Sequence, residues 1–270
     1  MLSIIVSSYR PDFYSALEKN IAATCGIVYE MIKVYNPGAM GICAAYNIGA
    51  EKSQYEHLLF LHEDVEFVTD NWGLFLSEYL NKSNCGVVGL AGSNYVPHVP
   101  FAWWDKYENT FKNVHQFNGH QEIRNYKVSD DKEVIVVDGV FIACKKKVYH
   151  EFLFNEKIKA YHGYDIDFST RVSEKYTNII GHTIKLKHFS EGNPDKDWWD
   201  NIVKNRRLFK APTKQKLDKK TELYFYKQLE KRVQLFQSSH KKIILIRYNN
   251  PRFIGYKAAL RNIINIILND

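Results

Sequence analysis

A chain of 270 residues is long enough for one large α/β domain with an appendage, and its 45% apolar and 25% charged residues are ordinary for a globular protein. The four cysteines are scattered without metal-binding or disulfide spacing, which fits a reducing compartment. No signal peptide is recognisable, and no apolar run approaches the roughly 18 residues needed to span a bilayer. Composition therefore excludes a disulfide-rich secreted domain, and we expect a cytoplasmic protein.

The formal charge of +7 is unevenly distributed along the chain. Residues 213–270 contain nine Lys and four Arg against two Asp and two Glu, so the rest of the chain is slightly acidic. This change in charge predicts two parts, residues 1–212 and a basic helical extension at 213–270. The chain has no RNA-binding motif and no regular interleaving of basic and aromatic residues, so a nucleic-acid partner is not expected.

Apolar patterns and turn residues predict alternating strands and helices through the first third of the chain. The expected strands are 2–8, 27–34, 58–61 and 85–91, and the expected helices are 12–24, 40–52 and 70–81. This alternation favours βαβ units and an α/β fold with a mostly parallel sheet and flanking helices.

The alternation is interrupted at residues 92–133, a stretch with two prolines and the pair Trp103-Trp104. A long irregular segment inside a compact domain is typically a binding loop or a lid, so we expect it to shape a site. Further strands are expected at 134–137, 140–144 and 179–186, and further helices at 146–152 and 165–175.

The segment 58–67 is the most informative in the chain, because an apolar run leads directly into His62, Glu63 and Asp64. The run predicts a buried strand, and polar residues at its carboxyl end would lie at the edge of the sheet where ligands bind. His62 and Asp64 are two residues apart, so on a strand they point to the same side and can hold a divalent metal. The alternative is an ordinary solvated strand end.

Several short motifs follow one another in an order that is more specific than any one of them. They are the opening strand, Asn47-x-Gly49, the strand ending at Asp64, Asp138-Gly139, the segment 163–171 and His188. This order resembles the GT-A fold glycosyltransferases, in particular the bacterial family-2-like enzymes, over roughly residues 2–192.

The resemblance implies a metal site and a donor site. In that family a D-x-D motif binds the metal and the donor diphosphate, which makes Asp64 a metal ligand, with His62 in place of the usual Asp and His188 as a third ligand. The implied ion is Mn²⁺ or Mg²⁺. The residues implied in donor binding are Ser7, Tyr9, Arg10, Tyr35, Asn36, Asn47, His62 and Asp64.

The resemblance also implies a general base and an acceptor site. Inverting members use a carboxylate at the start of a helix, which corresponds to Asp165, with Tyr164 in place of the usual Glu. Asp165 is alternatively a helix N-cap, and Asp167 fits the base position on a shifted register. The acceptor residues expected are Trp103, Trp104, Asp138 and Gly139, although both tryptophans are alternatively core residues.

The function implied is transfer of a single sugar, with inversion, from a nucleoside-diphosphate sugar to a hydroxyl of a glycan or lipid-linked acceptor in cell-surface glycan synthesis. The replacements at His62 and Tyr164 leave open a degenerate module that binds without turnover. A nucleotidyltransferase is a second alternative, but it would need a Gly-rich phosphate loop after the first strand, where the chain has residues 7–12 without glycine.

The C-terminal extension is expected to contain a Lys-rich helix at 213–237 and a second amphipathic run at 258–268. Arg252, Lys257 and Arg261 flank the second run. Such a helix can lie in a membrane interface, which would put the protein at the inner face of the membrane. Alternatively, its apolar face docks on the main domain or on a second copy of the chain.

Overall fold

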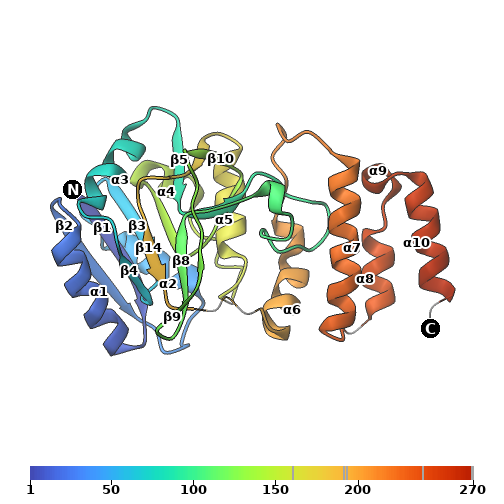
Figure 1. Cartoon of the computed structure of the whole chain (residues 1–270), viewed down its shortest axis with the longest axis horizontal. Coiled ribbons are helices and arrows are strands. Elements are labelled where there is room, and N and C mark those ends of the chain that lie inside the picture. Colours follow the sequence, from blue (N-terminus) through green and yellow to red (C-terminus); the bar gives the residue numbers. More distant parts are fainter. Residues whose placement is uncertain (160, 191, 193, 239, 269–270) are drawn as a thin grey trace.

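The computed structural model describes residues 1–159, 161–190, 192, 194–238 and 240–268. Within these residues a seven-stranded sheet has the strand order β10-β13-β5-β12-β3-β1-β2 (Figure 1). Its strands are β1 (Leu2–Ser8), β2 (Tyr29–Tyr35), β3 (His57–Leu61), β5 (Cys85–Gly89), β10 (Lys132–Val134), β12 (Phe141–Lys145) and β13 (Thr177–Ile180).

The predicted α/β class is confirmed, but the sheet is more mixed than the sequence predicts. β1 is parallel to β2 and β3, and β5 is parallel to β13. β12 lies antiparallel between β3 and β5, and β10 is antiparallel to β13. Half of the described pairings in this sheet are therefore antiparallel, because the chain reaches β12 from the irregular middle segment rather than through a helical crossover.

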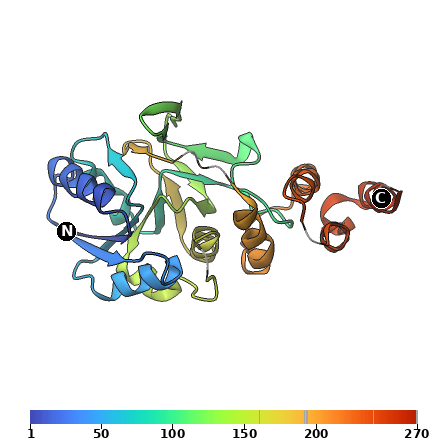
Figure 2. The same ribbon diagram turned by 90° about the horizontal axis from the view of Figure 1, so that it is seen from below.

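Helices cover both faces of the sheet, as the alternation of side chains along each strand requires (Figure 2). On β1, Ile4 and Val6 belong to a buried cluster with α1 and α3, whereas Ile5 belongs to the cluster on the opposite face with α2, α4 and α5. These helices are α1 (Pro11–Thr24), α2 (Ile42–Glu51), α3 (Trp72–Asn81), α4 (Lys146–Phe152) and α5 (Tyr164–Ser173).

Two small sheets are formed largely by residues that the sequence analysis expected to be irregular or to end the last strand. One has the order β4-β14-β8-β9, with β4 (Val65–Phe67), β8 (Val114–Asn118), β9 (Gln121–Asn125) and β14 (Leu186–His188). The other has the order β11-β6-β7, with β6 (Ala91–Ser93), β7 (Thr110–Lys112) and β11 (Val136–Val137), and a short 3₁₀ helix η1 (Tyr107–Asn109) precedes β7.

The prediction of one continuous strand at 179–186 is wrong, because β13 ends at Ile180 and β14 joins a different sheet. The buried amide of Asn113 explains the break. Its Nδ2 donates to the carbonyls of Gly181, His182 and Ile184 at 3.1, 3.0 and 2.8 Å. These bonds satisfy carbonyls that would otherwise pair in a continued strand, so the chain can turn out of the main sheet.

The C-terminal third is helical and lies at the end of the molecule opposite the N-terminus (Figure 1). Its elements are α6 (Lys196–Asn205), the 3₁₀ helix η2 (Arg206–Leu208), α7 (Lys219–Leu235), α8 (Lys241–Tyr248), α9 (Pro251–Ile254) and α10 (Tyr256–Leu268). α7 begins six residues later than predicted, because Asp218 caps it by accepting a hydrogen bond from the N–H of Lys220 at 3.0 Å. No helix in the described part of the chain is long and apolar enough to cross a membrane.

The helical extension is joined to the sheet domain through segment 95–105. Buried Glu222 on α7 accepts hydrogen bonds from the Tyr95 hydroxyl and the His98 N–H, both at 2.9 Å, and Arg232 pairs with Asp105. One buried apolar cluster also continues from the sheet into α7. The boundary at residue 213 stays a prediction from charge, since apolar packing is continuous across it.

Candidate active site

Three side chains at one edge of the structure form a cluster that can hold a metal ion. His62, Asp64 and His188 each present one ligand atom, and these atoms lie within 4.8 Å of one another. Nδ1 of His62 is 3.9 Å from Oδ1 of Asp64, and Nε2 of His188 is 3.6 Å from the same oxygen. The structure therefore brings together the three residues that the sequence predicted as ligands.

Strand pairing explains why residues so far apart in the chain meet. β3 ends at Leu61, and residues 62–64 lead directly into β4. β14 pairs antiparallel with β4, so that His188 lies opposite Val65, and the N–H of Phe189 donates to the carbonyl of Asp64 at 2.9 Å. The small sheet, and not the main sheet, delivers His188 to the cluster.

The charges within the cluster shift its pKa values. Burial raises the pKa of Asp64, but the hydrogen bond and the charge of His188 outweigh this effect, with help from His62, and bring it to about 2. Burial lowers the pKa of His62 despite Asp64 nearby, whereas Asp64 raises the pKa of His188 against the effect of burial. Asp64 is therefore a carboxylate and His62 a neutral imidazole near neutral pH, which are the forms that bind metals.

Tyr164 fixes which nitrogen of His62 faces the cluster. The Tyr164 hydroxyl donates to the carbonyl of Gly139 at 3.1 Å and lies 3.0 Å from Nε2 of His62. The hydroxyl has one proton and the carbonyl can only accept, so we assign that proton to the carbonyl, which makes the hydroxyl the acceptor for the proton of His62 Nε2. Nδ1 is then unprotonated and on the side of Asp64, as a metal ligand must be.

The donor set and its spacing fit a divalent ion. Two imidazoles and one carboxylate suit Mn²⁺ better than the harder Mg²⁺. The spread of 4.8 Å is only slightly wider than the ~4 Å across an ion with ~2 Å bonds. A small inward movement of the side chains would complete the site.

A cavity of about 270 Å³ opens on one side of the cluster, at the carboxyl end of β1. Ser7, Tyr9, Arg10 and Asn36, all predicted to contact a donor, line it. The remaining lining residues include Ile42, Tyr46, Glu63, Tyr161, His162 and Tyr164 together with the ligands His62 and Asp64.

Glu63 organises the loop at this cavity, a role that we did not predict. Its buried carboxylate accepts hydrogen bonds from the backbone N–H groups of Tyr9 and Arg10, each at 3.3 Å. The alternation of side chains along residues 62–64 is the signal in the sequence, because it turns Glu63 away from His62 and Asp64 and towards the chain that follows β1.

A second cavity, of about 390 Å³, opens on the other side of the same cluster. Trp103, Trp104, Asp138 and Gly139, predicted as acceptor residues, all line it, as does Asp165. Trp103 is 5% exposed and packs edge-on against Trp104 at 5.3 Å, so it is a core residue as well as part of the wall. The alternative of a core residue therefore holds for Trp103, and the acceptor role of the pair stays a prediction.

Trp198 on α6 completes this aromatic wall and was not predicted. Its ring lies 5.5 Å from that of Trp104, and it lines the second cavity. The signal in the sequence is Asp195 three residues earlier, which caps α6 by accepting a hydrogen bond from the Trp198 N–H at 2.7 Å.

Asp165 lies in the second cavity at the N-terminus of α5. Its Oδ2 accepts a hydrogen bond from the N–H of Gly139 at 3.2 Å. Burial, followed by the charge of Asp138, raises its pKa, and backbone N–H groups of Ile166 and Gly139 oppose them, so that the pKa is about 7. A carboxylate with this pKa can take up a proton near neutral pH.

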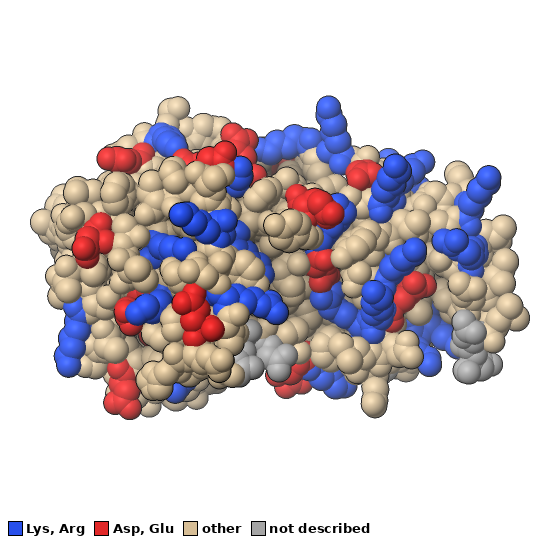
Figure 3. Space-filling model, in the orientation of Figure 1, with Lys and Arg blue, Asp and Glu red and all other residues tan. Residues whose placement is uncertain are grey.

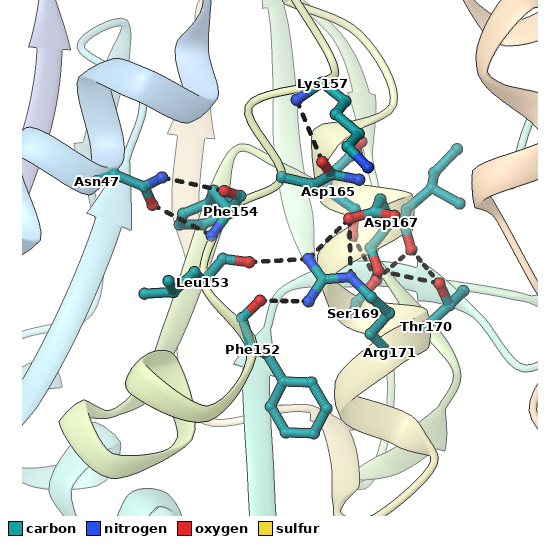
Figure 4. Close-up of polar contacts among 12 residues, drawn as sticks. Asn47, Phe152, Leu153, Phe154, Lys157, Asp165, Asp167, Ser169, Thr170 and Arg171 are labelled. Atoms are coloured by element: carbon teal, nitrogen blue, oxygen red, sulfur yellow. Dashed lines mark hydrogen bonds and ion pairs between the residues drawn. The ribbon is translucent and has the colours of Figure 1, made fainter.

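Asp167, the alternative base in the sequence analysis, is structural. It is 2% exposed and accepts two hydrogen bonds from the guanidinium of Arg171, at 2.9 and 2.7 Å. Figure 4 shows the same guanidinium directed at the carbonyls of Phe152 and Leu153, to which it also donates. Asp167 and Arg171 therefore anchor the chain after α4 and do not face the cavity.

Asn47 contacts that same segment instead of a donor. Its Nδ2 donates to the Phe154 carbonyl and to Glu156, and its Oδ1 accepts from the Phe154 N–H and the Tyr149 hydroxyl, at distances of 2.9–3.1 Å (Figure 4). With both ends of the amide engaged in the protein, the donor contact predicted for Asn47 is wrong.

The two predicted donor residues at the carboxyl end of β2 differ in position. Tyr35 is 66% exposed and is not part of the cavity wall. Asn36 is buried in the wall, and its amide holds the next turn through the carbonyl and N–H of Met40, at 3.0 and 3.1 Å. Asn36 therefore shapes the cavity, while Tyr35 points into solvent.

Comparison with known proteins identifies the family of the chain and supports its fold. The sequence profile of the Glycosyltransferase like family matches residues 3–211, and the chain belongs to this family. Among solved structures, GalNAc-T7 bound to UDP, GalNAc and Mn²⁺ superposes over 99% of this chain with a TM-score of 0.51 at 10% identity. The chain spans 57% of the length of that protein, and the likeness confirms the GT-A fold. No curated protein matches the sequence.

Proposed function

We propose that the protein is a metal-dependent glycosyltransferase that moves one sugar from a nucleoside-diphosphate sugar to an acceptor hydroxyl. The observation that carries this proposal is the position of the cluster formed by His62, Asp64 and His188 where two cavities meet. One cavity has the β1 loop held by Glu63, and the other has an aromatic wall and Asp165. A donor and an acceptor bound in the two cavities would meet at the cluster.

The donor cavity supplies contacts for a nucleotide. The loop at Tyr9 and Arg10 offers a cation and an exposed ring, and Glu63 holds its backbone. A bound divalent ion would offset the negative charge that grows on the departing diphosphate. We take a UDP-sugar as the first donor to test, because the superposed GalNAc-T7 binds UDP.

In the acceptor cavity Asp165 is the proposed general base. Its pKa of about 7 allows it to accept the proton of an acceptor hydroxyl as that oxygen attacks the anomeric carbon. The activated hydroxyl would attack the anomeric carbon on the face opposite the departing nucleoside diphosphate. We therefore propose inversion of configuration.

The acceptor we propose is a glycan or a lipid-linked sugar, used in cell-surface glycan synthesis. The ring of half-buried Trp104, which lines the cavity with Asp165, suits contact with a sugar, and Trp198, which is 8% exposed, packs against that ring. The proposed location is the cytoplasm, at the inner face of the membrane. The four cysteines, which are all free and buried, support a reducing compartment.

Thermal-shift measurements with nucleotides and nucleotide sugars, each with Mn²⁺, Mg²⁺ or chelator, would test binding, and release of nucleoside diphosphate would test turnover. We expect stabilisation by UDP and Mn²⁺ together, and release that requires the ion. Nucleotide binding without release of nucleoside diphosphate, whichever acceptor is supplied, would favour the degenerate module. Release of pyrophosphate from a nucleoside triphosphate would favour a nucleotidyltransferase. NMR of the first-formed anomer would decide between inversion and retention.

A further inference from the structure

Helix α10 is apolar on two opposite faces, and only one of them is covered by the described part of the chain. Ala259, Asn262 and Ile266 are 5–7% exposed on the inner face, and the helix packs on α8 and α9. The inner face therefore packs on helices within the extension, whereas the sequence analysis expected docking on the main domain or on a second copy. A long exposed apolar stripe on a helix ordinarily marks an interaction surface, so the outer face calls for a partner.

The outer face forms a continuous stripe along the whole helix. Its members recur at intervals of three or four residues, as one side of an α-helix requires. They are Tyr256, Leu260, Ile264, Ile267 and Leu268, which are 82%, 64%, 46%, 66% and 74% exposed. On neighbouring α8, Ile243 and Ile246 are 63% and 52% exposed. We call the five residues of α10 the outer stripe.

The charge around the outer stripe is mostly positive, although the carboxylate of Glu230 on α7 interacts with Arg261. Residues 231–268 contain four Lys and four Arg and no Asp or Glu. Lys257 and Arg261 are exposed and each directly follows a member of the stripe. Figure 3 shows many Lys and Arg side chains and fewer Asp and Glu side chains over the C-terminal helices. An exposed apolar stripe with basic neighbours fits a partner in which a layer of negative charge covers an apolar layer.

We propose that the outer stripe of α10 binds the surface of a membrane that contains anionic lipid. Thirteen residues span about 20 Å, too short to cross the hydrocarbon, so the helix would lie in the plane of the interface. Leu260, Ile264 and Ile267 would enter the acyl boundary, while Lys257 and Arg261 would reach the lipid phosphates.

The charge and the side-chain types distinguish this partner from two others. A second copy docked through the same stripe would bring two segments with no acidic residue against each other, which like-charge repulsion opposes. Nucleic acid would pair with the basic residues but would gain little from exposed Leu and Ile, because bases stack on aromatic rings. A membrane with anionic lipid can bind both the apolar stripe and its basic neighbours. This inference does not depend on the proposed catalytic function.

Co-sedimentation of the intact protein with vesicles tests the inference. We expect binding to phosphatidylcholine vesicles that contain phosphatidylglycerol, little binding to pure phosphatidylcholine, and release by high salt. Leu260→Asp with Ile264→Asp should lower the partition coefficient by at least about tenfold, and Lys257→Gln with Arg261→Gln by a comparable factor. Circular dichroism and the melting temperature would verify that the variants fold.

Matched control variants carry the same changes on the sheet domain. Val28→Asp with Leu74→Asp alters two residues that are 61% and 49% exposed, and Lys19→Gln with Lys52→Gln removes two exposed lysines. Both controls should sediment like the unaltered protein. The inference is overturned if the intact protein fails to bind anionic vesicles at low salt, or if the stripe variants bind as well as the controls. It is also overturned if the stripe changes instead abolish dimerisation or the binding of an oligonucleotide.

Discussion

Asp165 and Asp167 lie two residues apart on α5 and have opposite environments. Successive residues of a helix are rotated by about 100°, so residues two apart face nearly opposite directions. Asp165 lines the acceptor cavity with a pKa of about 7, while Asp167 is buried against Arg171. The helix thus separates the proposed catalytic base from the carboxylate that holds the fold.

Replacing Asp165 with Asn should lower the transfer rate by about 10²–10⁴-fold, because the acceptor hydroxyl loses its base. The dissociation constant of the nucleotide should change little, since the donor occupies the other cavity. Steady-state kinetics and calorimetric titration would measure the two effects. Asp200→Asn on the exposed face of α6 serves as the control, and near-normal turnover by the Asp165 variant would refute the assignment.

The raised pKa of Asp165 also predicts how stability depends on pH. The folded protein holds this proton up to about pH 7, whereas the unfolded chain releases it near pH 4. Stability contributed by this group is therefore full below about pH 4 and is lost as pH rises towards 7. The melting temperature of Asp165→Asn minus that of the unaltered metal-free protein should therefore be greater at pH 8 than at pH 4. An equal difference in melting temperature at both values would contradict the shift.

Tyr164 is a positioning residue whose effect should appear in metal affinity. Tyr164→Phe removes the hydroxyl that fixes Nδ1 of His62 as the ligand atom, and we expect Mn²⁺ to bind about 10–100-fold more weakly. Tyr161→Phe is a matched control, because Tyr161 lines both cavities but its hydroxyl donates to the Met40 carbonyl. Titration of the nucleotide-free protein with Mn²⁺ would measure both. Unchanged affinity in the Tyr164 variant would exclude this role.

At the scale of elements, Asn47 links α2 to the segment after α4. Four hydrogen bonds join its amide to Tyr149, Phe154 and Glu156. Asn47→Ala should lower the free energy of unfolding by about 2–4 kcal/mol, because it leaves buried partners unsatisfied. Nucleotide affinity of the folded variant should be nearly unchanged. Urea denaturation and calorimetry would measure these quantities, and a stable variant with poor nucleotide binding would restore the donor role predicted from the sequence.

Elements with a strong local pattern could be predicted from the sequence, and those fixed by distant contacts could not. The strand at Leu2–Ser8 and the helix at Lys146–Phe152 are found as expected, because their apolar residues follow one period. β8 and β9 are short and largely exposed, so they lack the alternation that marks a half-buried strand. β14 depends on Asn113, which is far away in the chain.

The same distinction applies to the candidate site. His62, Asp64, His188 and Asp165 were predicted because they stand at the ends of recognisable elements in a familiar order. Local signals mark the positions of Glu63 and Trp198, but their roles depend on contacts with the loop after β1 and with Trp104, which are distant in the chain. The error at Asn47 has the same origin, since its hydrogen-bond partners lie more than 100 residues away.

At the scale of the whole molecule, the charge boundary at residue 213 does not separate two hydrophobic cores. Buried Arg206 donates to the carbonyls of Pro97, Val99 and Phe209, and thereby ties the chain before α7 to the segment that leads to the tryptophan pair. From the extension itself, Arg232 and Tyr224 on α7 bind Asp105, the residue after the pair, so the wall of the acceptor cavity depends on the extension for its support.

We therefore expect the metal-free protein to unfold in one cooperative transition, with far-ultraviolet circular dichroism and tryptophan fluorescence changing together in urea. Arg232→Met, which breaks the pair with Asp105, should shift this transition to lower urea without splitting it. Two separate transitions would mean that the extension and the sheet domain unfold independently.

The position of Glu63 between His62 and Asp64 has a consequence for the order of binding. The three residues share one short piece of backbone, and Glu63 connects it to the loop that lines the donor cavity. If the ion draws His62 and Asp64 together, the loop at Tyr9 and Arg10 moves with them. Ion and nucleotide then belong to one thermodynamic cycle, in which each must strengthen the binding of the other by the same factor. Such reciprocity would keep the donor cavity weakly binding until the ion is in place.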